Sequence, residues 1–305
     1  MTQFLQQLVN GATLGATYAL IALGYTMVYG TIQLINFAHG EIFMIGAFSG
    51  LTVWKYWLPA SQRTNVWVAL PIVLVVAMTG SVITAVLMER FAYRPLRRAP
   101  RLAPLITAIG VSITLQEVVR LYYPGGTSQL PFPRLVSNGR FSVGGVTVPW
   151  VSVFVVVTAV AGMIALQAFV MRSRTGKAMR ATAQDPDTAR LMGINTDRVI
   201  VITFMLGAAL AGIAGVLQGM RFVQIDFRIG FLAGLKAFTA AVLGGIGNIT
   251  GAVLGGFLLG IVEALAIQYL PDGSAYKDVW AFVVLIAVLV FRPAGLLGER
   301  VGSRS

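Results

Sequence analysis

The stretch LINFAHGEIFMIGAF, residues 34–48, places three polar side chains in an otherwise apolar run. They are Asn36, His39, which is the only histidine of the chain, and Glu41. An imidazole and a carboxylate two residues apart can hold a ligand by hydrogen bonds, transfer a proton, or satisfy buried backbone groups. Two interpretations stay open. The three residues line a pathway or its gate, or Asn36 caps a helix while His39 and Glu41 satisfy each other or the nearby backbone.

A further acid, Glu263, lies alone in the apolar segment GFLLGIVEALAIQYL. A carboxylate in such a segment needs a partner, and Lys236 is one candidate. A proton relay usually needs several buried carboxylates or histidines, which are only scattered in this sequence. We therefore expect Glu263 to belong to a structural polar pair.

Composition limits what other chemistry the chain can do. Its 305 residues include no cysteine and one histidine, which excludes thiolate metal sites, iron–sulfur clusters and a histidine-based metal site. No set of nucleophile and base is evident, so we expect neither an intramembrane enzyme nor a cofactor. The segment RTGKA, residues 174–178, looks like the end of a phosphate-binding loop but lacks the earlier glycine and the following hydroxyl residue. ATP must then be bound by another polypeptide, unless an ion gradient drives the protein.

The elements that position these side chains are predicted to be membrane-spanning helices. Hydrophobic residues make up 57% of the chain, charged residues only 11%, and the mean hydropathy is +0.80. Stretches of about 20 residues with almost no charge match the length of a helix that crosses a bilayer. The basic residues behind the net charge of +12 gather at the ends of these stretches. This pattern indicates orientation in membrane lipid by the positive-inside rule and not binding of nucleic acid.

We predict an all-α polytopic membrane protein with eight or nine transmembrane helices in a single domain, residues 1–305. No Lys or Arg precedes Lys55, so the first span is expected to be retained, with its N-terminus outside. The segment GGIGNITGAVLGG, residues 244–256, divides the seventh span into a short broken or re-entrant helix followed by a full span. The predicted spans cover residues 8–30, 37–57, 66–88, 104–123, 150–171, 199–220, 236–270 and 279–291.

Two segments carry most of the cations and are predicted to be cytoplasmic. They are residues 88–104, with Arg90, Arg94, Arg97, Arg98 and Arg101, and residues 171–198. The basic tail favours a cytoplasmic C-terminus and contains Arg292, Arg300 and Arg304. Residues 122–150, rich in Gly, Pro and Ser, are predicted to form the long external loop.

Small residues recur at a spacing of four residues. Small side chains let helix backbones approach closely in lipid, so these pairs predict tight packing within the chain, with a subunit interface as the alternative. The pairs are Gly11/Gly15, Gly46/Gly50, Gly215/Gly219, Gly251/Gly255 and Gly256/Gly260.

The second basic segment contains ATAQDPDTARLMGIN, residues 181–195, whose pattern predicts a short helix. Asp185 suits the N-cap, Pro186 the first helical position, and Gly193 the left-handed position that follows the helix. Such a helix would rest on lipid headgroups or dock into a partner protein. Its expected apolar contacts are Ala189, Met192 and Ile194.

Three segments together resemble the LivH-type permeases of bacterial branched-chain amino acid ABC importers. They are NGATLGATYALIALGYTMVYGTIQLINFAHGEIFMIGAF, GKAMRATAQDPDTARLMGINTDRVI and LKAFTAAVLGGIGNITGAVLGG. The resemblance implies a transport subunit of the bacterial inner membrane, with Leu, Ile or Val as substrate and ATP hydrolysis on other chains. It implies as partners a related second permease, two cytoplasmic ATPases and a periplasmic substrate-binding protein. Urea and short-chain amide importers use similar permeases. An ion-coupled carrier that uses Glu263, Glu41 and His39 is a further alternative.

The resemblance also gives roles to residues. The helix from about Pro186 to Met192 would couple the permease to an ATPase, while Asn36, His39 and Glu41 stay the candidates for the pathway. The coupling candidates are Gly176, Arg180, Asp185, Pro186, Ala189 and Gly193. Residues 125–145 and 221–230 are expected to dock the binding protein, with Arg134, Arg140, Arg221 and Arg228 available to acidic partner residues.

Overall fold

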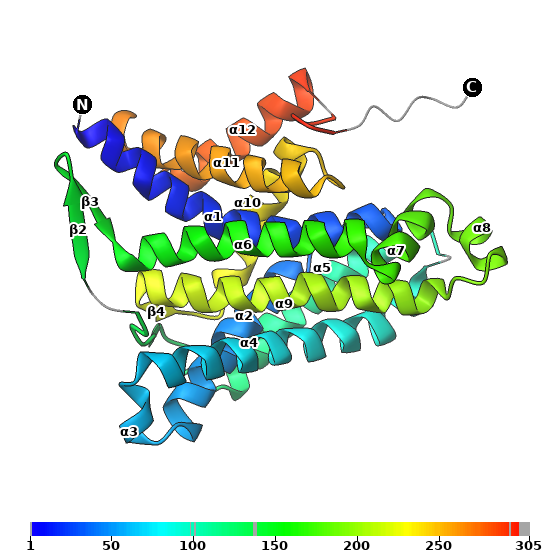
Figure 1. The fold of residues 1–305 in the computed structure, drawn as a ribbon, viewed down its shortest axis with the longest axis horizontal. Coiled ribbons are helices and arrows are strands. Elements are labelled where there is room, and N and C mark those ends of the chain that lie inside the picture. Colours follow the sequence, from blue (N-terminus) through cyan, green and yellow to red (C-terminus); the bar gives the residue numbers. More distant parts are fainter. Residues whose placement is uncertain (1, 98, 101, 137–138, 293, 299–305) are drawn as a thin grey trace.

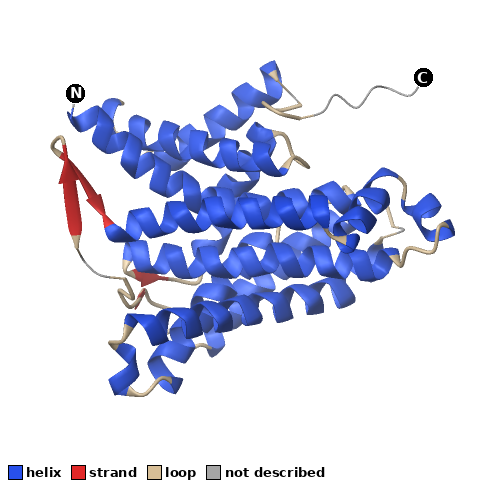
Figure 2. Ribbon diagram, viewed as in Figure 1, coloured by secondary structure: helices blue, strands red, loops and turns tan. Residues whose placement is uncertain are grey.

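The chain forms a bundle of long helices with two small antiparallel strand pairs, β1–β4 and β2–β3 (Figures 1 and 2). The computed structural model describes residues 2–97, 99–100, 102–136, 139–292 and 294–298. Four cations named above, Arg98, Arg101, Arg300 and Arg304, lie outside the described residues. The elements are α1 (Thr2–Ile32), α2 (His39–Thr52), η1 (Val53–Trp57), α3 (Ala60–Arg63), α4 (Val66–Met88), η2 (Glu89–Tyr93), η3 (Arg94–Leu96), α5 (Leu102–Tyr122), β1 (Leu130–Pro131), β2 (Arg140–Val143), β3 (Val146–Pro149), α6 (Trp150–Arg172), α7 (Arg174–Gln184), α8 (Pro186–Leu191), α9 (Thr196–Phe222), β4 (Gln224–Ile225), α10 (Ile229–Gly244), α11 (Ile249–Tyr269) and α12 (Lys277–Phe291).

Within the described residues, six helices are long and apolar enough to cross a membrane. They are α1, α4 together with η2 and η3, α5, α6, α9 and α11. Three shorter helices complete the bundle. α2 has 14 residues and continues into the π-helical turn η1, α10 has 16 residues, and α12 has 15. The predicted all-helical, polytopic architecture is confirmed, and the chain is a multi-pass membrane protein.

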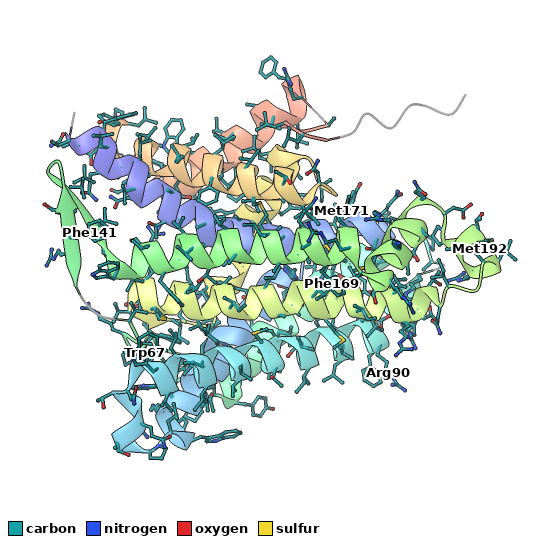
Figure 3. The ribbon with its side chains drawn as sticks, viewed as in Figure 1. Trp67, Arg90, Phe141, Phe169, Met171 and Met192 are labelled. Carbon is teal, nitrogen blue, oxygen red and sulfur yellow. The ribbon has the colours of Figure 1, made fainter. Side chains whose placement is uncertain are left out.

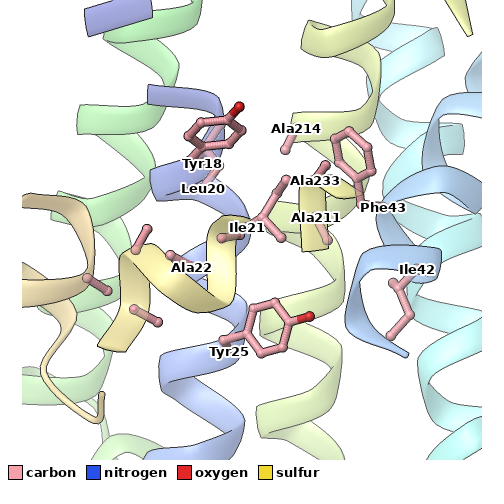
Figure 4. Close-up of a cluster of buried hydrophobic side chains, with 14 of the residues drawn as sticks. Tyr18, Leu20, Ile21, Ala22, Tyr25, Ile42, Phe43, Ala211, Ala214 and Ala233 are labelled. Atoms are coloured by element: carbon pink, nitrogen blue, oxygen red, sulfur yellow. The ribbon is translucent and has the colours of Figure 1, made fainter. Parts of the chain in front are cut away.

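The first helix is the centre of the bundle. Of the residues in the most apolar stretch of α1, 94% are buried inside the bundle. The corresponding share is 22% for α4 and for α5, and 17% for α6. α1 packs against α6, α9, α10 and α11, and Figure 4 shows Ile21 of α1 beside Ala211 and Ala214 of α9. The outer helices keep their apolar side chains exposed, as expected where lipid and not water surrounds the protein.

The pairs of small residues are contacts between helices of this chain. A Cβ carbon placed on Gly15 would lie 2.6 Å from the Cα of Phe257, and one on Gly260 would lie 2.2 Å from the nitrogen of Gly15. α1 and α11 therefore touch through their backbones. On α9, a Cβ on Gly215 would lie 2.4 Å from the Phe43 carbonyl oxygen of α2. Such close contacts increase dispersion attraction where no hydrophobic force acts between helices, and the expectation of internal packing is confirmed.

The predicted break in the seventh span is present but shorter than expected. α10 starts earlier than predicted, at Ile229, and ends at Gly244, and α11 begins at Ile249. α10 and α11 then run antiparallel, since Gly244 contacts Gly251. At 1.5 Å per residue α10 spans about 24 Å, less than the roughly 30 Å of a hydrocarbon core. α10 is thus the short helix and α11 the full span.

The basic segments lie at one end of the bundle. Figure 3 labels Arg90 and Met192 near that end, and Trp67 and Phe141 near the opposite end. After α12, the Leu296 and Leu297 amides donate hydrogen bonds to the carbonyls of Leu243 and Gly244, at the turn between α10 and α11. We call the first end the basic end and the second the hairpin end, because it carries the β2–β3 hairpin.

Candidate functional site

The chain breaks between α1 and α2, as predicted. Gln33 adopts a left-handed φ of 53°, and Asn36 stabilises the turn into α2. The Asn36 Oδ1 atom accepts hydrogen bonds from the Ala38 amide at 3.1 Å and from the Tyr93 hydroxyl at 2.8 Å. The buried Nδ2 atom of Asn36 has no hydrogen-bond partner in the part of the chain that the structure describes. Asn36 therefore joins α2 to η2 and keeps one donor unused.

His39 is packed into the centre of the bundle. Its side chain is 2% exposed, and its ring meets the Tyr25 ring edge to face with the centroids 4.9 Å apart. The imidazole fits beside Gly24 of α1, where a Cβ carbon would lie 2.1 Å from Nε2. This Nε2 atom is buried and finds no hydrogen-bond partner among the described residues.

Glu41 faces α5. Its Oε1 atom accepts hydrogen bonds from Ser112 Oγ at 3.0 Å and from Gln116 Nε2 at 2.9 Å. Its Oε2 atom points at the backbone of Gly230, where a Cβ carbon would lie 2.3 Å away, and no described residue donates a hydrogen bond to it. A fully buried carboxylate with one oxygen open is costly to hold in a membrane helix, and such groups are functional by default.

The structure brings Asn36, His39 and Glu41 to one end of α2 without joining them to one another. Among the hydrogen bonds of the described residues, none links His39 to Glu41. The mutual pairing of His39 and Glu41 is therefore wrong, whereas the pathway role and the satisfaction of nearby backbone stay predictions. They face different helices, and each of the three presents one buried polar atom without a partner. Among the described residues, no group of three His, Asp or Glu side chains is placed to hold a metal ion.

Glu263 has the cation that the sequence suggested. Its Oε1 atom lies 2.7 Å from Lys236 Nζ, and Lys236 also lies 2.6 Å from Asp278 Oδ1. The Tyr18 hydroxyl donates a hydrogen bond to Glu263 Oε2 at 2.9 Å. The network joins α1, α10, α11 and α12. Tyr18 and Asp278 were missed from the sequence because their contacts depend on how α1 and α12 pack against α10 and α11.

The short helix in the second basic segment is confirmed as α8. Asp185 Oδ1 accepts from the amides of Asp187 and Thr188, Pro186 is its first residue, and Gly193 has a φ of 83°. Ala189 is buried, whereas Met192 is 78% exposed and Leu191 is 88% exposed. Met192 is therefore exposed where a lipid or protein partner could meet it, and its expected apolar contact stays a prediction. α8 ends in an exposed apolar tip formed by Leu191 and Met192, and Figure 3 labels Met192 at the basic end of the bundle.

The helix before it, α7, was not predicted. Ser173 caps it by accepting from the Gly176 amide at 2.8 Å. Gly176 packs against the end of α6, where a Cβ carbon would lie 2.2 Å from the Val170 carbonyl oxygen, and Arg180 donates to the same oxygen at 2.8 Å. Gly176 and Arg180 therefore hold α7 against α6. The serine three residues before a glycine, followed by good helix formers, was the available signal.

The tip is connected to the long helix α9. Arg190 Nε donates to the hydroxyl of the buried Thr196, the first residue of α9, at 2.8 Å. Beside it, Arg97 bridges the exposed Asp197 of α9 and the buried Glu89 of η2. Both basic segments are thus attached to the start of α9.

The cations proposed for the outer surface divide into two groups. Arg134, Arg140 and Arg228 are exposed, and their contact with acidic residues of a binding protein stays a prediction. Arg221 is turned inward, and its Nη2 donates to the Asn10 carbonyl at 3.3 Å. Arg221 is therefore not available to a docking partner as expected, because its guanidinium lies between α9 and α1.

A membrane-spanning helical bundle, with buried polar groups at helix breaks and an exposed helical tip at one end, is the architecture expected of a membrane transport subunit. The chain belongs to the family described as "Branched-chain amino acid transport system / permease component", whose sequence model matches residues 7–289.

Curated relatives agree along the whole chain. It is 48% identical to the high-affinity branched-chain amino acid transport system permease protein BraD of Pseudomonas aeruginosa and 47% identical to LivH of Escherichia coli (strain K12). Both matches cover 97% of this chain and 96% of the relative. It is also 26% identical to LivM of the same Escherichia coli strain, over 95% of this chain and 69% of LivM.

A solved structure shares the fold. PsaBC from Streptococcus pneumoniae in complex with Fab superposes with a TM-score of 0.51 and covers 95% of this chain and 92% of that one. The sequences are only 11% identical, so this likeness concerns the arrangement of helices alone.

Proposed function

We propose that this chain is the permease subunit of a binding-protein-dependent ABC importer for branched-chain amino acids in a bacterial inner membrane. The observation that carries this proposal is the 46–48% identity, over 97% of the chain, to proteins named as branched-chain amino acid permeases. The alternatives raised by the sequence, a urea or amide permease and an ion-coupled carrier, have no such support.

A related second permease is the proposed membrane partner. The match to LivM, a permease of the same transport system as LivH in Escherichia coli by its name, supports this pairing. Because the sequence holds no complete phosphate-binding loop, ATP binding belongs to other chains in this proposal. Two such ATPases would dock at the basic end. A periplasmic binding protein would approach the hairpin end, where Arg134, Arg140 and Arg228 are exposed.

Asn36, His39 and Glu41 are the proposed polar contacts of the pathway. Each offers a buried atom without a hydrogen-bond partner among the described residues. Asn36 offers an amide donor, Glu41 a carboxylate oxygen, and His39 a ring nitrogen. Because a buried polar atom without a partner is costly, these atoms favour the entry of water or a polar substrate during the transport cycle.

The exposed tip of α8 is the proposed ATPase contact. Leu191 and Met192 are apolar side chains presented to the outside of the bundle, as expected of a surface that another protein covers. A movement of the tip would reach α9 through Arg190 and Thr196. α9 packs against α1, α2 and α4, so it would carry the movement to the break that holds Asn36 and His39.

The test is reconstitution of transport. The chain is co-expressed with its genomic neighbours, purified, and placed in proteoliposomes with ATP inside. The binding protein and a panel of leucine, isoleucine, valine, urea and short amides are added outside. We expect ATP-dependent uptake of the three amino acids only.

Two controls make the result decisive. Liposomes with this chain alone should take up nothing, with or without an ion gradient. Uptake by the chain alone that an uncoupler abolishes would establish the carrier instead, and ATP-dependent uptake restricted to urea or amides would overturn the proposed substrate.

A further inference from the structure

A cavity of about 620 Å³ opens within this chain toward the hairpin end. Its mouth is formed by Thr127 and Gln129, and its inner wall by the buried Lys236 and Glu263. This volume lies within the range of about 300–1,000 Å³ that is usual for small-molecule sites. The cavity is separate from Asn36, His39 and Glu41, none of which lines it. We call it the head-group pocket.

The inner wall of the head-group pocket holds three charged side chains, one from each of α10, α11 and α12. Lys236 lies within 2.7 Å of both Glu263 and Asp278, so one ammonium serves two carboxylates. Lys236 and Glu263 are 5% and 3% exposed, whereas the Asp278 side chain is 34% exposed. These three groups alone carry one excess negative charge, and Arg221, which lines the same cavity, balances it. Ionisable groups at this depth are costly in a membrane protein and usually serve a ligand or another charge.

The facing wall offers a donor and an acceptor that nothing occupies. Arg221 Nη1 and Gln218 Oε1 are both buried, and both lack a hydrogen-bond partner among the described residues. They lie three residues apart on α9 and so share one face of the helix. The Arg221 Nη2 atom donates a hydrogen bond to the Asn10 carbonyl. This bond holds the guanidinium in place and leaves Nη1 without a partner among the described residues.

The rest of the lining is aliphatic. Leu14 of α1, Leu232 of α10 and Ile267 of α11 line the same cavity. A ligand that matches these walls has an anionic end, a cationic end and a compact apolar body. An aliphatic α-amino acid in its zwitterionic form has all three.

We propose that the head-group pocket binds a zwitterionic aliphatic α-amino acid on its way through the permease. Its carboxylate binds Arg221, its ammonium group binds Gln218 Oε1 and Asp278, and its side chain packs on Leu232 and Ile267. The inference rests on the proposed function for the class of substrate, and it adds a binding site on this chain. A charge-assisted hydrogen bond to Arg221 makes the carboxylate essential to binding.

The test uses the absence of cysteine from the chain. Leu232→Cys places a single thiol in the head-group pocket, and Leu270→Cys places one on the same end but outside it. The two leucines are 44% and 39% exposed, so the variants are matched in accessibility. The full-length variants in lipid nanodiscs are labelled with a small maleimide in the presence of leucine, 3-methylbutylamine or 4-methylpentanoate.

Leucine should slow the labelling of Leu232→Cys about tenfold, and the two analogues, which lack the carboxylate or the ammonium group, should slow it far less. Labelling of Leu270→Cys should not change. Adding Arg221→Gln to Leu232→Cys should remove the protection by leucine, whereas adding Arg228→Gln, at the exposed rim, should not.

Equal labelling with and without leucine would overturn the inference, as would equal protection by all three compounds. Uptake by the reconstituted importer separates this outcome from the proposed function. ATP-dependent leucine uptake without protection rejects the pocket alone, whereas protection without any amino-acid uptake rejects the proposed function and keeps the pocket.

Discussion

The imidazole of His39 occupies the space that a side chain at position 24 would need, and that position holds Gly24. A Cβ carbon on Gly24 would lie 2.1 Å from His39 Nε2 and 3.1 Å from the Gly207 carbonyl oxygen of α9. Three helices therefore meet around one buried ring at the start of α2. The glycine is as much part of the candidate pathway as the histidine, because it sets where the ring lies.

Gly24→Ala should displace His39 and destabilise the protein. Overpacking of a tight interior typically costs about 1–3 kcal/mol, and here the added methyl group meets a rigid ring and a backbone carbonyl. The measurement is thermal unfolding of the purified protein in detergent. Gly110→Ala is the matched control, since a Cβ carbon there meets nothing within 4 Å. A Gly24→Ala protein as stable as the Gly110→Ala protein would contradict the close packing of His39.

Gln116→Leu should destabilise the protein by roughly 1–3 kcal/mol, because the buried Glu41 loses one of its two donors. Adding Glu41→Leu should restore part of that loss by removing the charge. Thr114→Val is the control on the same helix, since the Thr114 hydroxyl is exposed and bonds only to the carbonyl of its own helix. Additive effects of Gln116→Leu and Glu41→Leu would show that these side chains do not interact.

The positions of the spans could be predicted from the sequence because the signal is local. An apolar run of about 20 residues that ends at polar or basic residues marks a helix, whatever it packs against. The same holds for α8, where Asp185, Pro186 and Gly193 each act on the backbone of their own turn.

The partners of the buried polar residues could not be predicted in the same way. Ser112 and Gln116 share a face of α5, but only the tertiary packing brings them to Glu41, about 70 residues earlier in the chain. Asp278 follows Glu263 along the chain at the start of the next helix, yet its place beside Lys236 depends on how α10, α11 and α12 pack. The mutual pairing of His39 and Glu41, one part of the structural interpretation, was wrong for this reason.

Lys236→Met should be among the most damaging substitutions in the bundle. It leaves the carboxylates of Glu263 and Asp278 without their shared cation, and breaking a buried pair by removing one partner costs about 3–5 kcal/mol. Glu263→Gln should be milder, because Lys236 keeps Asp278. The check is a double-mutant cycle on thermal stability, in which the double variant should be more stable than the sum of the single effects. Strict additivity would mean that the ion pair contributes nothing.

Leu191→Ser with Met192→Ser should uncouple transport without disturbing the fold. Burial of each side chain against a partner is worth about 1.5–3 kcal/mol, so ATP-dependent uptake should fall at least roughly tenfold in reconstituted importer. Thermal stability of the permease should not change, because both side chains are exposed. Leu270→Ser, an exposed leucine at the hairpin end, is the control and should transport normally. Normal uptake by the double variant would exclude the tip as the ATPase contact.

Arg180→Gln and Gly193→Ala test how the tip is held. Arg180 braces α7 against the Val170 carbonyl, and Gly193 ends α8 with a left-handed φ of 83° that costs any other residue roughly 1–2 kcal/mol. Both changes should tilt the tip away from its partner while the membrane helices keep their packing. ATPase activity stimulated by the binding protein should therefore fall in the assembled importer, and the permease should still elute as a folded complex. Wild-type coupling in both variants would mean that α7 and α8 do not transmit the motion.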